Sequence, residues 1–203
     1  MLIRDTAFAA IDFESAGTTR GSTDAPVQLG LAVLSGGELP PEWQFRSYLH
    51  TDQPVAWAAS RVHGIRKEDL QGAPSLLDLW PRLNATLRSR VVVAHGKGTE
   101  KRFLRAFPLH GFAPWVDTLQ VAQAAYPEHP DFSLEALTTS LELLPAVQAI
   151  CPALSFHDAL FDAVASLLVL RRIIADAGLA DAPVDALCCP ERSTYFARRR
   201  WRH

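Results

Sequence analysis

The feature that most constrains the fold of this chain is an apolar run that ends in two acids. Residues 7–11 are Ala-Phe-Ala-Ala-Ile, and Asp12 and Glu14 follow at alternate positions. A short apolar run is typical of a buried strand, and side chains two residues apart on a strand face the same side. The pattern predicts a buried strand over residues 7–12 whose end presents two carboxylates on one face. Two acids so placed favour a site for a divalent cation.

The composition is that of a single globular domain. The chain has 203 residues, 48% of them hydrophobic and 21% charged, which is enough to bury a substantial core. The formal net charge is −2, so the protein as a whole is not a polycation built to bind nucleic acid. Contacts with phosphate would have to come from a local patch or from bound cations.

Sequence features that would indicate export or membrane insertion are not found. The three cysteines, Cys151, Cys188 and Cys189, are an odd number, and the adjacent pair lacks the spacing of a zinc or redox motif. The first residues lack a signal-peptide pattern, and no apolar stretch approaches the length of a membrane span. We therefore expect a cytoplasmic protein with reduced thiols and no membrane partner.

Hydrophobic periodicity predicts strands first and helices later. Further strands are predicted at residues 27–34, 43–49, 90–94 and 115–118. Helical spacing covers residues 76–87 with Ser75 as N-cap, residues 103–107, a helix capped by Ser133, and residues 157–175. The first three strands suggest an antiparallel meander. The later alternation of strands and helices indicates the α/β class, with a three-layer or mixed sheet.

The domain organisation is predicted as one domain over residues 1–178 and a basic tail over residues 179–203. Residues 198–202 are Arg-Arg-Arg-Trp-Arg. Such a run is typical of a solvated terminus, and a basic, aromatic arm that touches nucleic acid is the alternative.

Four acids from separate segments are the candidate metal ligands. Asp12 and Glu14 end the first strand, Glu100 starts a helix after the strand at 90–94, and Asp162 lies in the last long helix. Carboxylate oxygens suit Mg²⁺ or Mn²⁺, whereas soft ligands for zinc are missing from the set. Two such cations, about 3.5–4 Å apart, can activate a water and stabilise the departing oxygen of a phosphodiester.

His157 is the candidate general base, because an unperturbed imidazole pKa of about 6.5 lies near working pH. The five-residue step from His157 to Asp162 is not a same-face spacing on a helix. We therefore expect His157 at or just before the helix start, on a turn, with Asp162 one turn in. Single residues also have structural interpretations: Glu100 and Glu135 suit a helix dipole, and His95 suits a hydrogen-bonded structural role.

Five segments, taken in order, resemble the DEDDh branch of the DnaQ-like 3′–5′ exonucleases. That family includes bacterial proofreading subunits, RNase T and oligoribonuclease. The similarity covers about residues 7–175. Its segments are the Asp-x-Glu of residues 12–14, the His-Gly-Ile of 63–65, the apolar strand, His and acid of 91–100, the Asp-Thr of 117–118, and the His-x-x-x-x-Asp of 157–162. The Val-Gln-Leu-Gly of residues 27–30 also matches a second-strand pattern of the family.

The resemblance implies a ribonuclease-H-like three-layer fold, with a five-stranded mixed sheet and helices on both faces. The implied activity is two-metal-ion hydrolysis that releases nucleoside 5′-monophosphates from the 3′ end of single-stranded or frayed DNA or RNA. By position, the residues it assigns are the metal ligands Asp12, Glu14, Glu100 and Asp162, the general base His157, and the substrate contacts Phe13, Ser15, Ala16 and His63. A homodimer and a polymerase partner are left open.

Two departures from the family pattern bear on activity. Glu100 stands where the family usually has Asp, and Gly96 stands where it has Asn. A non-catalytic nucleic-acid-binding or accessory module on the same fold is therefore the alternative hypothesis, because a fold does not determine a function. A metal-dependent phosphoesterase that acts on small nucleotides is a third.

Overall fold

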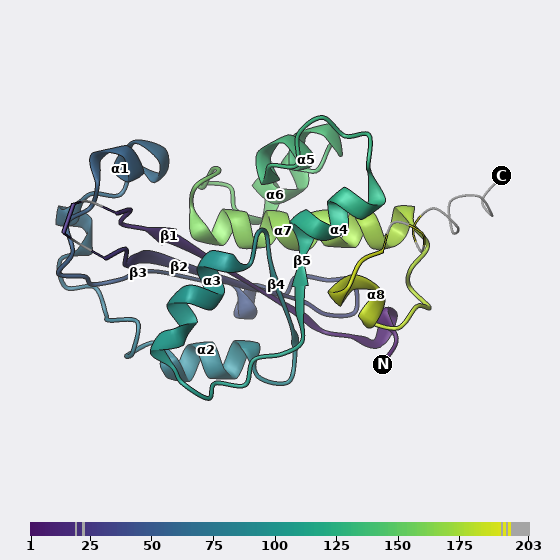
Figure 1. Ribbon diagram of the computed structural model, residues 1–203, viewed down its shortest axis with the longest axis horizontal. Coiled ribbons are helices and arrows are strands. Elements are labelled where there is room, and N and C mark those ends of the chain that lie inside the picture. The colour runs from purple at the N-terminus through teal and green to yellow at the C-terminus, as the bar shows by residue number, and fades with distance from the viewer. Residues whose placement is uncertain (19, 22, 192, 194, 196–203) are drawn as a thin grey trace.

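The computed structural model has a five-stranded mixed sheet at its centre (Figure 1). It describes residues 1–18, 20–21, 23–191, 193 and 195. The strand order is β3-β2-β1-β4-β5. The strands are β1 (Phe8–Ser15), β2 (Pro26–Leu34), β3 (Phe45–Tyr48), β4 (Val91–Ala94) and β5 (Trp115–Asp117). β1, β2 and β3 form the antiparallel part, and β4 and β5 run parallel to β1.

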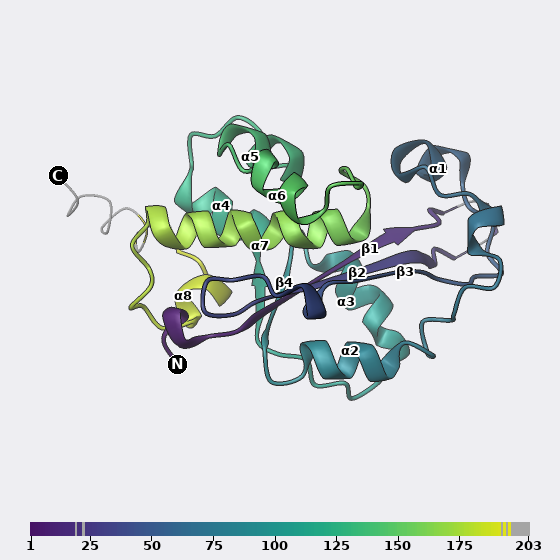
Figure 2. The same cartoon turned by 180° about the vertical axis from the view of Figure 1, so that it is seen from behind.

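Helices cover both faces of this sheet, as Figures 1 and 2 show from opposite sides. α7 lies along one face with α4, α5 and α6 beside it, and α2 and α3 lie on the other. The helices are α1 (Trp57–His63), α2 (Trp80–Leu87), α3 (Gly98–Phe103), α4 (Thr118–Ala125), α5 (Leu134–Ser140), α6 (Leu144–Ile150), α7 (Ala159–Asp176) and α8 (Asp185–Cys188). The predicted three-layer α/β fold is confirmed.

The two cores follow from alternation along the strands. In β1, Phe8 and Ala10 pack into the core on the α7 side, whereas Ala9, Ile11 and Phe13 pack into the core beneath α2 and α3. Because successive strand side chains point to opposite faces, the even-numbered acids that follow belong to the α7 side. The fold thus turns the two carboxylates of β1 toward the long helix.

The helix α7 approaches the sheet closely at β2. A Cβ atom added to Gly30 would lie 2.0 Å from the carbonyl oxygen of Ala159, a distance that no side chain can occupy. Only glycine allows the first turn of α7 to rest on the strand backbone at this point. The glycine of the Val-Gln-Leu-Gly segment therefore sets the depth at which α7 enters the site.

Several element boundaries differ from those predicted. The helix predicted to start after Ser75 begins only at Trp80, because the Ser75 side chain closes a turn with Asp78 instead of capping the helix. Trp43, predicted to lie in a strand, ends a 3₁₀ turn that starts at Pro41. The helices α1, α4, α6 and α8 were not predicted. The predicted N-cap at Ser133 is present, since its hydroxyl accepts the N–H of Ala136 at 3.3 Å.

The chain beyond residue 178 contributes to the core. Leu179, Leu187 and Tyr195 are buried in the cluster on the α7 side, and the Tyr195 hydroxyl donates to the carbonyl oxygen of Ala186 at 3.0 Å. The basic run at residues 198–202 lies outside the described residues, so the tail stays a prediction. Within the described part of the chain, no helix combines the length and apolarity that crossing a membrane requires.

Candidate active site

The candidate site lies where β1 and β4 end, beside the start of α7. β1 and β4 are parallel, so their carboxyl ends meet at one edge of the sheet. β1 brings Asp12 and Glu14 to that edge, and the chain after β4 turns into α3, whose first turn carries Glu100. α7 brings Asp162 in its own first turn. The four acids thus come from three elements that share one edge.

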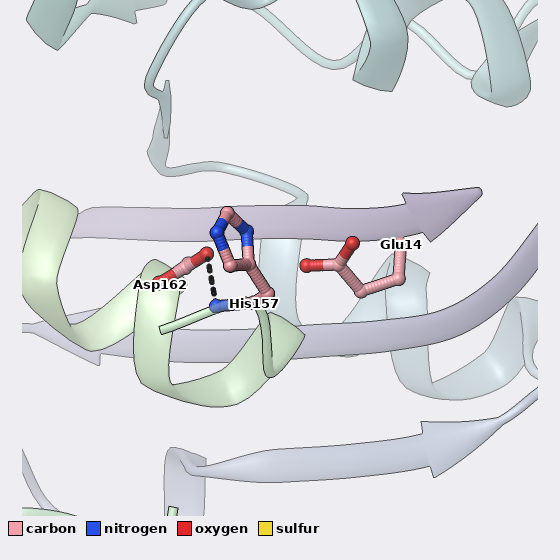
Figure 3. Close-up of side chains that lie close together, drawn as sticks. All are labelled: Glu14, His157 and Asp162. Atoms are coloured by element: carbon pink, nitrogen blue, oxygen red, sulfur yellow. Dashed lines mark hydrogen bonds between the residues drawn. The ribbon is translucent and has the colours of Figure 1, made fainter. Parts of the chain in front are cut away.

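Glu14, His157 and Asp162 form the tightest group. One ligand atom of each lies within 4.8 Å of the other two, the only such cluster of potential metal ligands among the described residues. Figure 3 shows the imidazole of His157 between the two carboxylates. The backbone N–H of His157 donates to Oδ2 of Asp162 at 3.2 Å. The sequence-predicted base and two of the predicted ligands are therefore brought together.

The turn before α7 explains how His157 reaches this position. His157 has φ +67, and Asp158 is the N-cap of α7. Asp162 lies in the first helical turn. The predicted placement, with His157 just before the helix and Asp162 one turn in, is confirmed. A left-handed backbone conformation is unusual for a non-glycine residue and persists only where neighbouring contacts hold it.

Asp12 lies within electrostatic reach of the other acids. Burial raises its pKa well above the usual value, and the carboxylates of Asp162, Glu100 and Glu14 raise it further, in that order. Burial, followed by Asp162, Asp158 and Glu100, raises the pKa of Glu14 to about 8. Without a cation, the carboxyl of Glu14 therefore holds a proton at neutral pH.

Asp162 and Glu100 show the same effect. Burial raises the pKa of Asp162 to about 7, opposed by the N–H of His157 and supported by Asp158 and Glu135. Burial raises the pKa of Glu100 to about 7; its own backbone N–H opposes the shift and Asp117 adds to it. Glu100 is 4% exposed but lies outside the tight group of three.

The unsatisfied oxygens of these acids fit a divalent cation. Oε2 of Glu100 and Oδ1 of Asp162 are buried and have no hydrogen-bond partner. Buried polar atoms are seldom left unpaired, and an ion is one explanation when they are. Carboxylate oxygens are also the ligands that Mg²⁺ and Mn²⁺ prefer.

The loop after β1 is joined to α1 next to the site. Nε2 of His63 lies 3.1 Å from the carbonyl oxygen of Ser15, and Nδ1 accepts the N–H of Ile65 at 3.0 Å. Burial is the main cause that lowers the pKa of His63, and the His157 imidazole lowers it further. Ser15 and His63 are thus placed beside the acidic group.

Phe13 and Ala16 are placed differently from the other predicted substrate contacts. Phe13 is 6% exposed and meets the ring of Phe103 edge-on at 5.5 Å, on the sheet face away from α7. Ala16 is buried in a small apolar cluster that includes Ile65. The side chains of Phe13 and Ala16 support the loop, and alternation along β1 is the reason that Phe13 points away from its acidic neighbours.

The turn between β4 and α3 is held by contacts of His95, Gly96 and Asp117. The His95 ring lies 2.9 Å from both the hydroxyl of Thr118 and the carbonyl oxygen of Phe132, which is the structural role that the sequence analysis favoured. Oδ1 of Asp117 accepts the N–H of Gly96 at 2.9 Å. Asp117 therefore ties the end of β5 to the turn that leads to Glu100.

The start of α7 is held by its N-cap Asp158 and by the partners Gln28 and Arg46. The sequence analysis assigned no role to these three residues. Oδ1 of Asp158 accepts the N–H of Leu160 at 3.1 Å, as an N-cap does. An acid directly before a long apolar helix is a signal that could have identified this cap. The partners from β2 and β3 had no such signal, because they are distant in the sequence.

Comparison with known proteins decides the family. A family model described as an exonuclease, RNase_T, matches residues 9–170. The chain belongs to this exonuclease family. The predicted resemblance to DnaQ-like exonucleases of the DEDDh type is thereby confirmed, and membership implies a nuclease that depends on divalent cations.

Individual relatives of this exonuclease are distant. It is 25% identical over 175 residues to a PolC-type DNA polymerase III of Thermotoga maritima. The matched segment is 84% of this chain but only 12% of that protein. A DNA polymerase III subunit epsilon-like protein of Rhodobacter capsulatus is 25% identical over 171 residues, or 82% of the chain and 23% of that protein. The chain thus spans a small fraction of the length of these relatives.

Solved structures show the same fold. Exonuclease X in complex with 5′ overhanging duplex DNA has a TM-score of 0.69 at 22% identity and covers 86% of this chain and 98% of its own. The nuclease domain of 3′hExo, a DEDDh family member bound to rAMP, has a TM-score of 0.68 at 14% identity, with coverages of 87% and 95%. The ribonuclease-H-like architecture is therefore confirmed.

Proposed function

We propose that this exonuclease removes nucleoside 5′-monophosphates from the 3′ end of single-stranded or frayed nucleic acid with the help of two Mg²⁺ or Mn²⁺ ions. The observation that carries the proposal is the meeting of Glu14, His157 and Asp162 within 4.8 Å, with two partnerless carboxylate oxygens nearby. An acidic group next to an imidazole is the arrangement that metal-assisted phosphodiester hydrolysis needs.

The acids are proposed to hold the cations. Glu14 and Asp162 belong to the tight group of three, and Asp12 lies within electrostatic reach of both and of Glu100. When bound, divalent cations lower the pKa of a water and stabilise negative charge on the departing oxygen. Glu100 has one methylene more than the usual Asp, and its buried, partnerless Oε2 supports a role as ligand.

His157 is proposed to take the proton from the attacking water. It is exposed, so a water can reach its ring, and the N–H bond to Asp162 holds its backbone in place. Ser15 and His63 are proposed to lie beside the terminal nucleotide, because they border the acidic group. Phe13 and Ala16, although buried, would support that contact through the loop backbone.

The names of the relatives support the substrate class. The similar structures include complexes with overhanging duplex DNA and with a dT13 oligonucleotide, and a 3′-exonuclease that recognises a histone mRNA stem-loop. Because both DNA and RNA occur among them, the sugar of the substrate needs its own test. The match to PolC-type polymerases favours one further candidate role, trimming of frayed primer ends for a polymerase.

The test is digestion of a 5′-labelled oligonucleotide in Mg²⁺ or Mn²⁺, run in parallel on DNA and RNA. A ladder of progressively shorter labelled products supports the proposal, whereas immediate release of a labelled mononucleotide means the opposite polarity. Asp12→Ala should abolish the ladder, and Asp52→Ala, at a side chain that is 97% exposed, is the matched control. An inactive wild type that also fails to bind Mn²⁺ in calorimetry would favour the non-catalytic module.

A mismatched primer terminus tests the polymerase-linked role. A faster ladder from a mismatched 3′ end than from a paired one supports trimming of frayed ends, because a mismatch lowers the cost of unpairing. Equal rates on both termini contradict it.

A further inference from the structure

Gln28 holds the first turn of α7 with both ends of its amide. Its side chain is 1% exposed and lies on β2. Oε1 accepts the backbone N–H of Ala159 at 2.8 Å, and Nε2 donates to Oδ2 of Asp158 at 2.9 Å. One buried amide therefore binds the N-cap of α7 and the first N–H of the helix at the same time.

A second strand holds the same cap. Nε of Arg46, on β3, donates to Oδ2 of Asp158 at 2.5 Å, and its guanidinium lies over the ring of Tyr48 at 5.1 Å from the centroid. Oδ1 of Asp158 is occupied by the N–H of Leu160. Both oxygens of Asp158 are thus hydrogen-bonded. We call Asp158, together with Gln28 and Arg46 that bind it, the anchor of α7.

Gln28, which holds Asp158, lies opposite one of the site acids in the sheet. Glu14 and Gln28 are direct partners in the antiparallel pairing of β1 and β2, so their side chains share the face that α7 covers. Gly30, two residues further on, allows the carbonyl oxygen of Ala159 to approach the strand. The position of α7 relative to Glu14 is therefore set by residues of β2.

The anchor also neighbours the strained residue of the site. His157, at φ +67, directly precedes Asp158, and Asp162 lies four residues beyond it. A conformation of this kind persists when surrounding contacts over-determine it. The bonds from Gln28 and Arg46 hold the side chain of Asp158, and Gln28 also accepts the N–H of Ala159. The bond to Asp162 fixes the N–H of His157.

We propose that Gln28, assisted by Arg46, is a positioning residue that sets His157 and Asp162 against Glu14. The inference rests on the proposed function of this site and assigns a role to residues that touch neither substrate nor cation. Reactions of this kind tolerate little misplacement, since an error of about 1 Å can cost about 10²-fold in rate. Loss of the hydrogen bonds from Gln28 should thus lower kcat while changing KM little.

Gln28→Met tests this, because it keeps the length of the side chain and removes both hydrogen bonds. We expect kcat to fall about 10- to 100-fold while KM changes by less than about threefold. Val164→Ala, at a fully buried site on α7 beyond the first turn, is the control for lost stability. An unchanged kcat in Gln28→Met, or an equal loss in Val164→Ala at the same Tm, overturns the proposal.

Arg46 offers a second variant that does not disturb the buried core. Arg46→Met should lower kcat in the same direction as Gln28→Met, and Arg46→Lys, which keeps a cation near Asp158, should restore part of it. An Arg46→Met enzyme with wild-type kcat overturns the assisting role of Arg46. This pair also keeps the proposal testable if Gln28→Met fails to fold.

Amide hydrogen exchange tests the anchor independently of activity. The N–H of Ala159, bonded to Gln28, should lose protection in Gln28→Met, whereas amides in the middle of α7 should keep theirs. Unchanged protection at Ala159 overturns the proposal even if the wild type proves active. If the wild type has no nuclease activity, the proposed function is wrong. Protection of the Ala159 N–H then still shows whether Gln28 holds the start of α7.

Discussion

The backbone N–H of His157 donates to Oδ2 of Asp162 at 3.2 Å, so the proposed base and a proposed metal ligand are linked through the main chain. The imidazole is left free of this bond and lies between Asp162 and Glu14 (Figure 3). Substituting the ring therefore removes the proposed base without removing the contact that orders the turn. The roles of the ring and of the acids can be separated by experiment.

His157→Ala is expected to lower kcat by about 10²–10⁴-fold, the range typical of general acid–base catalysis. Mn²⁺ affinity should stay within about threefold of wild type, because the carboxylates are the proposed ligands. Calorimetry and single-turnover digestion measure the two quantities. A loss of Mn²⁺ affinity as large as the loss of rate would instead make the His157 nitrogen a ligand, an arrangement its distance from Glu14 and Asp162 also permits.

Asp162→Asn separates cation binding from stability. The amide oxygen can still accept the N–H of His157, but the negative charge is lost. We expect Mn²⁺ affinity to fall at least about tenfold, since the charge of the ligands sets affinity for hard cations. The metal-free variant should be more stable at pH 8 by about 1–3 kcal/mol, because a buried, repelled carboxylate is removed. A less stable variant under those conditions contradicts this account.

Local patterns predicted the parts of this site that depend on one strand or one helix. Alternation placed Asp12 and Glu14 on one face, and the five-residue step placed His157 before a helix that contains Asp162. Contacts across the sheet were beyond such patterns: the amide of Gln28 meets an N–H that lies 131 residues further along the chain. The burial of Phe13 and Ala16 was missed for a related reason, since assignment by family position ignores the direction in which a side chain points.

Helices without a strong apolar period were also missed. α4, Thr118–Ala125, is rich in small residues, and α1 has no buried residue at all. Tertiary contacts determine such segments: the N–H of Ala56, the N-cap of α1, donates to the carbonyl oxygen of Ala16 at 2.7 Å. The polarity of digestion came from the family resemblance, and the 5′-labelled oligonucleotide tests it.

The stability of the metal-free protein should fall as pH rises from about 5 to 8. Burial and repulsion raise the pKa values of Glu14, Glu100 and Asp162, so the folded state binds more protons than the unfolded state in this range. The free energy of unfolding then decreases with pH, by at most about 1.4 kcal/mol per unit for each such group. Denaturant titrations in a chelator measure it.

Divalent cations should reduce this pH dependence. Mn²⁺ binds the ionised carboxylates of the folded state and therefore stabilises it most where they are deprotonated. The variant Asp162→Asn should show a shallower decrease in the chelator than wild type does. Stability that stays constant or rises from pH 5 to 8 without metal would contradict the raised pKa values.

Variants of Glu100 test whether Glu can serve as a metal ligand where the family usually has Asp. Glu100→Gln should lose at least about tenfold in Mn²⁺ affinity, because a charged ligand becomes neutral. Glu100→Asp restores the acid that the family usually has and should keep activity within about tenfold of wild type. If Glu100→Gln binds Mn²⁺ and digests substrate as wild type does, Glu100 is a buried structural acid, and Asp12, Glu14 and Asp162 suffice.

Gly30→Ala should destabilise the protein by about 3 kcal/mol or more, because the new methyl carbon would lie 2.0 Å from the carbonyl oxygen of Ala159 and the backbones must separate. Gly98→Ala is the matched control: it lies in α3, its added Cβ meets nothing within 4 Å, and alanine should stabilise the helix slightly. Chemical denaturation compares the two. Since a displaced α7 carries His157 and Asp162 away from Glu14, any folded Gly30→Ala protein should also lose nuclease activity. Wild-type stability in Gly30→Ala would mean that α7 does not rest on β2 as closely as described.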